Sequence, residues 1–347
     1  MLQRAWPRAI RQAAVGAIIG AVIVLALGLF LAVLRYDPTR AAYALFDGAF
    51  GSWYAFASGT LVRGTPLVLT GLAVAVAFRA GVFNVGAEGQ FLMGATAAAA
   101  LALYGPALNR PLVILLCFIA GSILGALWAA IAAILRTRFH VLEVISTIML
   151  NFAAMYLVSY LVRGPMQEPT HVYPQTAAIP AAAELPRLPA VRLHLGFFIA
   201  LAAAGSTWWV IRNTAAGFRL RATGANPDAA RSAGGVNVNQ VVFSAFAISG
   251  ALAGLAGAIE VQGVTFALYE NISPGYGYTA IAVALLARLD AALVVPAGIL
   301  FGALEAGAAA MQRDAGVPSV VVAVVEAALI LALLGARSIR QHFREAA

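Results

Sequence analysis

The sequence predicts an all-α protein that crosses a membrane many times, with about ten transmembrane helices. Its composition is the first indication. Hydrophobic residues fill 62% of the 347 positions and charged residues only 10%, whereas soluble domains carry about 25% charged residues. The second indication is the arrangement of the apolar residues. They fall into about ten runs, most of them near the ~20 residues that cross a hydrocarbon core.

The chain contains no lysine, so all 22 of its basic residues are arginines. A Walker A phosphate-binding loop requires a lysine, and its absence excludes ATP hydrolysis by that motif. The single cysteine, Cys117, excludes an intrachain disulfide, and the four histidines lack metal-ligand spacing. The arginines are scattered between apolar runs, which argues against a nucleic-acid surface. We therefore expect no catalytic residue, no metal and no cofactor.

The first apolar run, about 13–34, follows three arginines. It is too long for the apolar region of a signal peptide, so we expect a retained transmembrane helix. Nine further runs follow. They cover about 64–78, 88–104, 111–135, 141–162, 195–211, 241–262, 276–287, 292–312 and 317–335. Between and beyond them lie two tails, 1–12 and 336–347, and two long loops, 163–194 and 212–240.

The arginines are unevenly divided between alternate loops. With the N-terminus in the cytoplasm, 14 of the 22 lie on the inner side and 8, including Arg63, on the outer side. Inner loops of membrane proteins carry an excess of arginine, so both termini are predicted to be cytoplasmic. The loop 163–194 is then external. It is rich in proline and forms either an ordered cap or a plain connector.

The cytoplasmic loop 212–240 contains the start and stop signals of a short helix. Asn226 is a good N-cap, Pro227 suits the first helical position, and Gly234 ends the helix. This helix is either a connector or a coupling helix that docks on a partner protein. The candidate coupling residues are Arg221, Asn226, Asp228, Ala229, Ala230 and Gly234.

The second and third runs meet in a polar, glycine-rich segment near 79–91, which predicts a broken helix. Irregular backbone at membrane depth is tolerated only where it is buried in protein or lines water. Interrupted helices often form the binding sites of transporters. Asn84, Glu88 and Gln90 are therefore candidate substrate-pathway residues. The alternative is an ordinary turn at the inner surface, with Glu88 exposed to water.

Polar groups interrupt two later runs. Glu143, Thr147 and Asn151 are spaced four apart and share one helical face. Asn151 either contacts substrate or forms hydrogen bonds between helices. For Glu143 we expect interhelical hydrogen bonding or a role in coupling. Tyr276 and Tyr278 either anchor their helix at the membrane interface or stack on a base or sugar.

Two more glutamates, Glu305 and Glu326, lie inside apolar runs. Ionisable groups are costly in hydrocarbon, so each is a candidate pathway residue. Protonation or pairing would also account for such a position. If Glu88, Glu305 or Glu326 coupled transport to an ion gradient, the protein would be a secondary transporter.

Four blocks of the sequence resemble, in the same order, blocks of bacterial ABC importer permeases of the branched-chain amino acid/ribose-type family. Within that family they are most similar to simple-sugar and nucleoside permeases. The third block matches the E-A-A-x-x-x-G coupling pattern, with Asp228 in place of Glu. A departure is Arg288-Leu-Asp290, where a Gly-rich or Asn-rich turn is common. The blocks are Phe83–Gln90, Glu143–Asn151, Arg221–Gly234 and Gly275–Leu286.

The resemblance implies a single transmembrane permease domain over residues 1–347, in the bacterial inner membrane. It implies three protein partners besides membrane lipid: an ABC ATP-binding subunit, a second permease chain, and a periplasmic or lipoprotein substrate-binding protein. The chain would be no enzyme. It would translocate a nucleoside or simple sugar with energy from the separate ATP-binding subunit. The competing hypotheses are the ion-coupled transporter and a membrane-embedded enzyme, for which the sequence offers no nucleophile–base pair.

Overall fold

The computed structural model describes residues 25–26, 28–106, 108–318, 320–321, 323–324 and 327–328. Within these residues the regular structure is helical, and the β-type pairings are two isolated bridges. The all-α fold class is therefore confirmed. The chain divides into two compact units. Unit 1 comprises Met1–Thr60 and Ala303–Ala347, and unit 2 comprises Leu61–Gly302.

Six helices of the described chain are long and apolar enough to cross a membrane. The protein is therefore a multi-pass membrane protein. Two of these helices include a π-helical turn: Ala55–Leu61 precedes α3 (Val62–Arg79), and Val261–Thr265 follows α10 (Val238–Glu260). The six are Ala55–Arg79, Arg110–Phe139 (α5), Glu143–Arg163 (α6), Leu195–Asn213 (α7), Val238–Thr265 and Ala291–Ala315 (α12).

Four of the ten predicted spans do not appear among these six. Helix α4 (Ala87–Tyr104) begins with polar residues, and α11 (Tyr276–Leu286) has only 11 residues. The runs 13–34 and 317–335, and both tails, lie largely or wholly outside the described residues. Helix α2 (Pro38–Phe50), which the side chain of Asp37 caps, was not predicted.

Arg63 does not lie in an outer loop, as its place before the second apolar run had suggested. It is the second residue of α3, in a helix that is continuous from Ala55 to Arg79. The first turns of this helix consist of small and weakly polar residues, which carry little hydropathy signal. Arg63 is therefore removed from the count of external loop arginines.

Unit 1 forms where α2 packs against the C-terminal half of α12. A Cβ atom added to Gly48 would meet Ala310, so glycine allows the two helices to approach closely. The buried core of this unit contains Leu31, Ala41, Ala308, Met311 and Val317.

Unit 2 is organised around α10, which packs against α3, α4 and α5. Glycines bring α5 and α10 into backbone contact: a Cβ on Gly125 would meet Gly250, and one on Gly254 would meet Gly121. Small residues spaced four apart commonly permit such packing between membrane helices. The most apolar stretch of Ala55–Arg79 is 89% buried, compared with 28% for α6 and α7. The first helix is thus interior, whereas α6 and α7 leave most of their apolar surface exposed.

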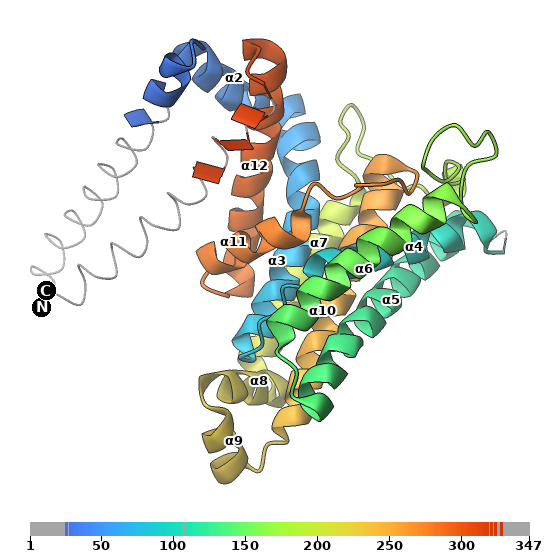
Figure 1. Cartoon of the computed structure of the whole chain (residues 1–347), viewed down its shortest axis with the longest axis vertical. Coiled ribbons are helices and arrows are strands. Elements are labelled where there is room, and N and C mark those ends of the chain that lie inside the picture. Colours follow the sequence, from blue (N-terminus) through green and yellow to red (C-terminus); the bar gives the residue numbers. More distant parts are fainter. Residues whose placement is uncertain are drawn as a thin grey trace, which may run out of the picture. The chain divides into compact units, whose positions relative to one another are not determined.

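Figure 1 shows two short helices, α8 (Ala215–Ala225) and α9 (Pro227–Gly234), at one end of unit 2. The long segment between α6 and α7 lies at the opposite end (Figure 1). The charge distribution predicts that α8 and α9 are cytoplasmic and that this segment is external.

The cap segment, residues 164–194, is ordered by hydrogen bonds to the chain that follows α10. The Thr176 N–H donates to the Leu268 carbonyl at 2.8 Å, and the Ile179 N–H donates to the Phe266 carbonyl at 2.8 Å. The segment is therefore an ordered cap and not a plain connector.

Candidate functional site

A short non-helical turn, residues 80–86, separates α3 from α4 at the predicted position of the broken helix. Gly81 in this turn has φ of 75°, which glycine adopts without the steric cost of a Cβ atom. Both flanking helices are buried, and in the turn itself Val82 and Asn84 are buried whereas Gly81 and Phe83 are exposed.

Asn84 holds this turn against α10. Its Nδ2 donates to Gln90 Oε1 at 3.0 Å and to Ser249 Oγ at 2.9 Å, while its Oδ1 accepts from the Gly86 N–H at 2.9 Å. Asn84 and Gln90 are both buried. Buried polar groups are stable only when they are hydrogen-bonded. The two amides therefore satisfy each other and fix the shape of the turn.

Asn151 connects α6 to the same turn. Its Oδ1 accepts from the Gly89 N–H at 2.8 Å, and its Nδ2 donates to the Val85 carbonyl at 2.9 Å and to Tyr278 Oη at 3.3 Å. Of the two roles considered for Asn151, the structure therefore displays hydrogen bonding between helices. The same side chain brings α11 to the site through Tyr278.

Glu88 is buried, with 8% of its surface exposed, so the alternative of a water-exposed glutamate is wrong. Its carboxylate accepts a hydrogen bond from the Gly277 N–H at 2.7 Å. Gly277 permits this approach, because a Cβ there would collide with the backbone of Glu88. Tyr276 packs edge-on against Phe91, with ring centroids 5.7 Å apart, whereas Tyr278 keeps 45% of its surface exposed.

Glu143 also contacts the turn. It forms an ion pair with Arg136 of α5, and it accepts a hydrogen bond from the Phe83 N–H at 3.4 Å. The Thr147 hydroxyl donates to the Glu143 carbonyl of its own helix at 2.7 Å. Glu143 thus joins α5, α6 and the turn.

The structure brings together six of the predicted pathway residues. Glu305 lies on the part of α12 that belongs to unit 1, and Glu326 lies outside the described residues. The described chain contains no group of three or more His, Cys, Asp or Glu side chains placed to hold a metal. The six residues around the turn are Asn84, Glu88, Gln90, Asn151, Tyr276 and Tyr278.

The loop 212–240 folds as two helices where one was predicted. Helix α9 starts and stops as expected: Asn226 Oδ1 accepts from the Asp228 and Ala229 N–H groups, each at 3.0 Å, and Gly235 follows the helix with φ of 56°. The preceding helix α8 was missed. It is capped by Thr214; it contains two glycines, which disfavour a helix, and its apolar periodicity is weak.

Helix α8 connects α9 to the turn. Leu220 is buried in the core that α3, α5 and α10 share, and a Cβ on Gly224 would meet the Arg79 carbonyl at the end of α3. The Arg221 guanidinium donates to the Ile211 carbonyl of α7. Helix α8 therefore packs directly against the end of α3, where the turn begins.

The exposed face of α9 contains Asp228 and Ala229, whereas Ala230 is buried. Asp228 forms an ion pair with Arg231 at 3.4 Å, and both side chains are largely exposed. Exposed pairs of this kind contribute little to stability. The charged side of α9 is thus available for contact with another protein.

Two groups at this end of unit 2 have shifted pKa values: Glu270, in the chain that follows α10, and His194, in the cap segment. Hydrogen bonds from Arg163 and Ser159 hold the pKa of the Glu270 carboxyl at about 2. Burial, with a smaller contribution from the charge of Arg187, lowers the pKa of His194 to about 4. His194 is fully buried, and neither ring nitrogen has a hydrogen-bond partner among the described residues.

The profile of the family described as "Branched-chain amino acid transport system / permease component" matches residues 56–334, which is most of the chain. The chain belongs to this permease family. Members are membrane subunits of transport systems, so the expectation that this chain is not an enzyme is confirmed. No solved structure matches the permease.

Individual relatives are similar to the permease over nearly its whole length. The guanosine ABC transporter permease protein of Bacillus subtilis is 40% identical over 322 residues, which cover 90% of each chain. The glucose ABC transporter permease protein of Haloferax volcanii is 37% identical, over 91% of this chain and 85% of its own. The nucleoside ABC transporter permease protein of Lactococcus lactis is 33% identical, over 91% and 86%.

The permease also places two ionisable side chains inside its helices that sequence reasoning missed. Glu260, at the C-terminal end of α10, is 4% exposed, and the charge of Arg63 on α3 acts on it. Charged groups within membrane helices commonly pair with each other. Glu260 was visible as an acid within the run 241–262. The position of Arg63 inside a helix was hidden, because the sequence had assigned it to a loop.

Proposed function

We propose that this permease is the membrane-spanning subunit of an ATP-binding-cassette importer for a nucleoside or a simple sugar. Relatives that are 33–40% identical to it are named as guanosine, nucleoside and glucose ABC transporter permeases. The lack of lysine excludes a Walker A loop in the chain itself. ATP hydrolysis is therefore assigned to a separate subunit.

The observation that carries this proposal is the contact between α8 and the end of α3. In the proposed mechanism the ATP-binding subunit docks on the exposed side of α9, at Asp228 and Ala229. Its movement passes through α8 to the turn at residues 80–86. From the turn, the hydrogen bond between Glu88 and Gly277 conveys the movement to α11.

The residues around the turn then have different roles. The amides of Asn84, Gln90 and Asn151 are engaged within the protein, so we assign them to the wall of the pathway. Tyr278 is exposed and sits on the helix that Glu88 positions, and we assign it to stacking on a base or sugar face. Tyr276 supports α11 from behind, and Glu305 is retained as a pathway residue of unit 1.

The proposed assembly contains a second permease chain, two ATP-binding subunits, and a periplasmic or lipoprotein substrate-binding protein that meets the cap segment. The arginine distribution supports both termini, α8 and α9 in the cytoplasm of a bacterial cell. The membrane is then the inner membrane, and the runs 13–34 and 317–335 would add spans toward the predicted ten.

Uptake by reconstituted vesicles tests this function. The permease is incorporated with its ATP-binding subunit, second permease chain and binding protein, and the accumulation of labelled guanosine and glucose is measured. We expect uptake of either guanosine or glucose when ATP is supplied on the side of the vesicle membrane that carries the ATP-binding subunit. Uptake that follows a proton or sodium gradient and ignores ATP would instead support the ion-coupled transporter.

Tyr278 provides a test of the site within the same assay. Tyr278→Ala is expected to raise the KM for uptake by about 5- to 150-fold, because stacking on a base contributes about 1–3 kcal/mol. Tyr278→Phe keeps the ring and is expected to retain uptake. Tyr156→Ala, at an exposed position of α6, controls for the loss of a surface tyrosine.

A further inference from the structure

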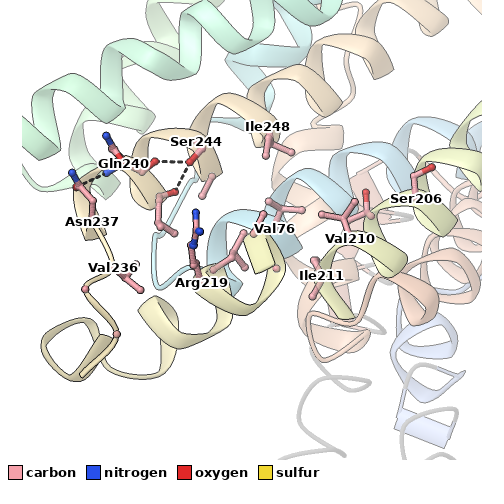
Figure 2. A pocket seen from close by; sticks show the side chains of 18 residues that line it. Val76, Ser206, Val210, Ile211, Arg219, Val236, Asn237, Gln240, Ser244 and Ile248 are labelled. Carbon is pink, nitrogen blue, oxygen red and sulfur yellow. Dashed lines mark hydrogen bonds between the residues drawn. The ribbon is translucent and has the colours of Figure 1, made fainter. Parts of the chain in front are cut away.

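A cavity of about 660 Å³ lies in unit 2, between α7, α8 and the first half of α10. It is separate from the turn at residues 80–86, because none of the six residues gathered there lines it. Figure 2 shows Asn237 and Gln240 at one side of its wall and Val210 at the other, with Ser206 close to Val210. Asn237, Gln240 and Ser244 lie along α10, and Val210 and Ile211 lie across the cavity on α7 (Figure 2).

Arg219 projects from α8 into this cavity (Figure 2). In the described part of the chain its guanidinium has no ion pair or hydrogen bond, whereas the nearby Arg212 is paired with Asp290 at 2.9 Å. No aspartate or glutamate is among the described residues of the cavity wall. The cavity therefore contains an uncompensated positive charge.

Two side chains with neutral amides line the same cavity. Asn237 accepts a hydrogen bond from the Gln240 N–H at 3.2 Å through its Oδ1, so this bond does not use its Nδ2 donor. The side-chain amide of Gln240 also belongs to the wall. A guanidinium together with amide N–H groups is a suitable set of donors for a phosphate oxygen.

Along α7 and α10 the wall consists of apolar side chains with the hydroxyls of Ser206, Thr207 and Ser244 between them, and it borders exposed apolar surface. Val210 on α7 and Ile248 on α10 line the cavity, and they are 40% and 47% exposed. Trp209 and Phe243, their neighbours on the same helices, are 55% and 40% exposed. A charged end next to α8 and an apolar end along two membrane helices match the two parts of a phospholipid.

We propose that this cavity binds one anionic membrane phospholipid. Its phosphate contacts Arg219 and the amides of Asn237 and Gln240, and an acyl chain lies along Val210 and Ile248. Basic pockets between transmembrane helices recognise anionic head groups in this way. The occupied cavity holds α8 against α7 and α10, so the lipid supports the helix that connects α9 to α3.

Thermal unfolding of the full-length permease in detergent micelles tests this site. The probes are phosphatidylglycerol, phosphatidylcholine and inorganic phosphate, each added separately. A ligand that binds only the folded protein raises the unfolding midpoint, and we expect about 5 °C with phosphatidylglycerol. Phosphatidylcholine and inorganic phosphate are expected to raise it by less than a third of that.

Two variants locate the effect. Arg219→Gln is expected to abolish the preference for phosphatidylglycerol, whereas Arg138→Gln, an exposed and unpaired arginine outside the cavity, is expected to retain it. Ile248→Trp fills the apolar end and is expected to reduce the shift even with Arg219 intact. Phe243→Trp, on the same helix but outside the cavity wall, is the matched control.

The proposal is overturned if phosphatidylcholine and phosphatidylglycerol act equally, or if Arg219→Gln keeps the full shift. An equal response to inorganic phosphate would assign the cavity to a small anion and not to lipid. The cavity would be assigned to the ATP-binding subunit if binding of that subunit abolished the midpoint shift caused by phosphatidylglycerol and Ile248→Trp had no effect on that shift.

Discussion

The buried amides of Asn84, Gln90 and Asn151 donate and accept within the protein, and these bonds decide their contribution to transport. An unpaired amide in an apolar interior costs free energy, so each keeps its partner in the resting structure. Their role in that structure is to fix the turn at residues 80–86 in one shape. Tyr278, which is partly exposed, is better placed to meet a substrate.

The first prediction concerns Asn151. Asn151→Ala leaves the Gly89 N–H and the Val85 carbonyl without their partner, at a cost of about 1–3 kcal/mol for each buried group. We therefore expect a lower midpoint of thermal unfolding in detergent. Asn213→Ala, which removes an exposed amide at the end of α7, should change the midpoint little. Equal effects of the two variants would contradict the role assigned to Asn151.

His194 predicts a pH dependence of the cap segment. Its pKa is about 4 in the folded protein and near 6.5 when unfolded, so the unfolded chain binds the additional proton between these values. Stability is therefore present above pH 6.5 and is lost as the pH falls toward 4. The loss amounts to about 2 kcal/mol between pH 7 and 5.

Hydrogen exchange of residues 164–194 as a function of pH measures this effect. We expect the protection of the cap segment to decrease from pH 7 to pH 5 in the natural protein and in His171→Gln, a variant at an exposed histidine. In His194→Gln the decrease should be absent. A decrease that persists in His194→Gln would exclude His194 as its source.

At the scale of elements, the adjacent helices α8 and α9 differ in what they contact. Helix α8 is anchored in the core by Leu220, and α9 exposes Asp228 and Ala229 but buries Ala230. A bulky residue at Ala230 would therefore disturb packing within the permease. The exposed Ala229 is the better position at which to test docking.

We predict that Ala229→Phe lowers ATP-driven uptake by tenfold or more while the permease still reaches the membrane. The ATP-binding subunit would continue to hydrolyse ATP, because only its contact with α9 is changed. Ala215→Phe, at an equally exposed position at the start of α8, is the matched control and should transport normally. Normal uptake by Ala229→Phe would argue against docking at α9.

At the scale of the whole molecule, the unequal number of arginines on the two sides of the membrane predicts the orientation. The cap segment and the α8–α9 pair lie at opposite ends of unit 2 (Figure 1), so one of them must face outward if the unit spans the membrane. The excess of arginine near α8 and α9 predicts that the cap segment faces outward.

Labelling with a membrane-impermeant maleimide on intact cells checks this orientation. The natural Cys117 is buried and should not react. Thr170→Cys, in the cap segment, is expected to react from outside, and Asp228→Cys, on α9, only after the cells are permeabilised. The reverse pattern would place both termini and the proposed ATPase contact on the wrong side.

Local signals in the sequence predicted those elements that depend on short-range physics. The apolar runs predicted the helices of unit 2, because a helix that crosses the hydrocarbon core needs a long apolar stretch. Asn226, Pro227 and Gly234 predicted α9, since capping involves only neighbouring residues. The polar segment 79–91 indicated a break between α3 and α4, because such a segment is costly within a membrane helix.

The sequence by itself thus determined a helical membrane protein, its family and the position of its broken helix. Only the tertiary structure decided that Asn84 pairs with Gln90 and Ser249, that the charge of Arg63 acts on the buried Glu260, and that the proline-rich segment is an ordered cap. These features join residues that are far apart in the chain or depend on which face of a helix is buried. Hydropathy and capping carry no information about such partners, because they are set by how the helices pack.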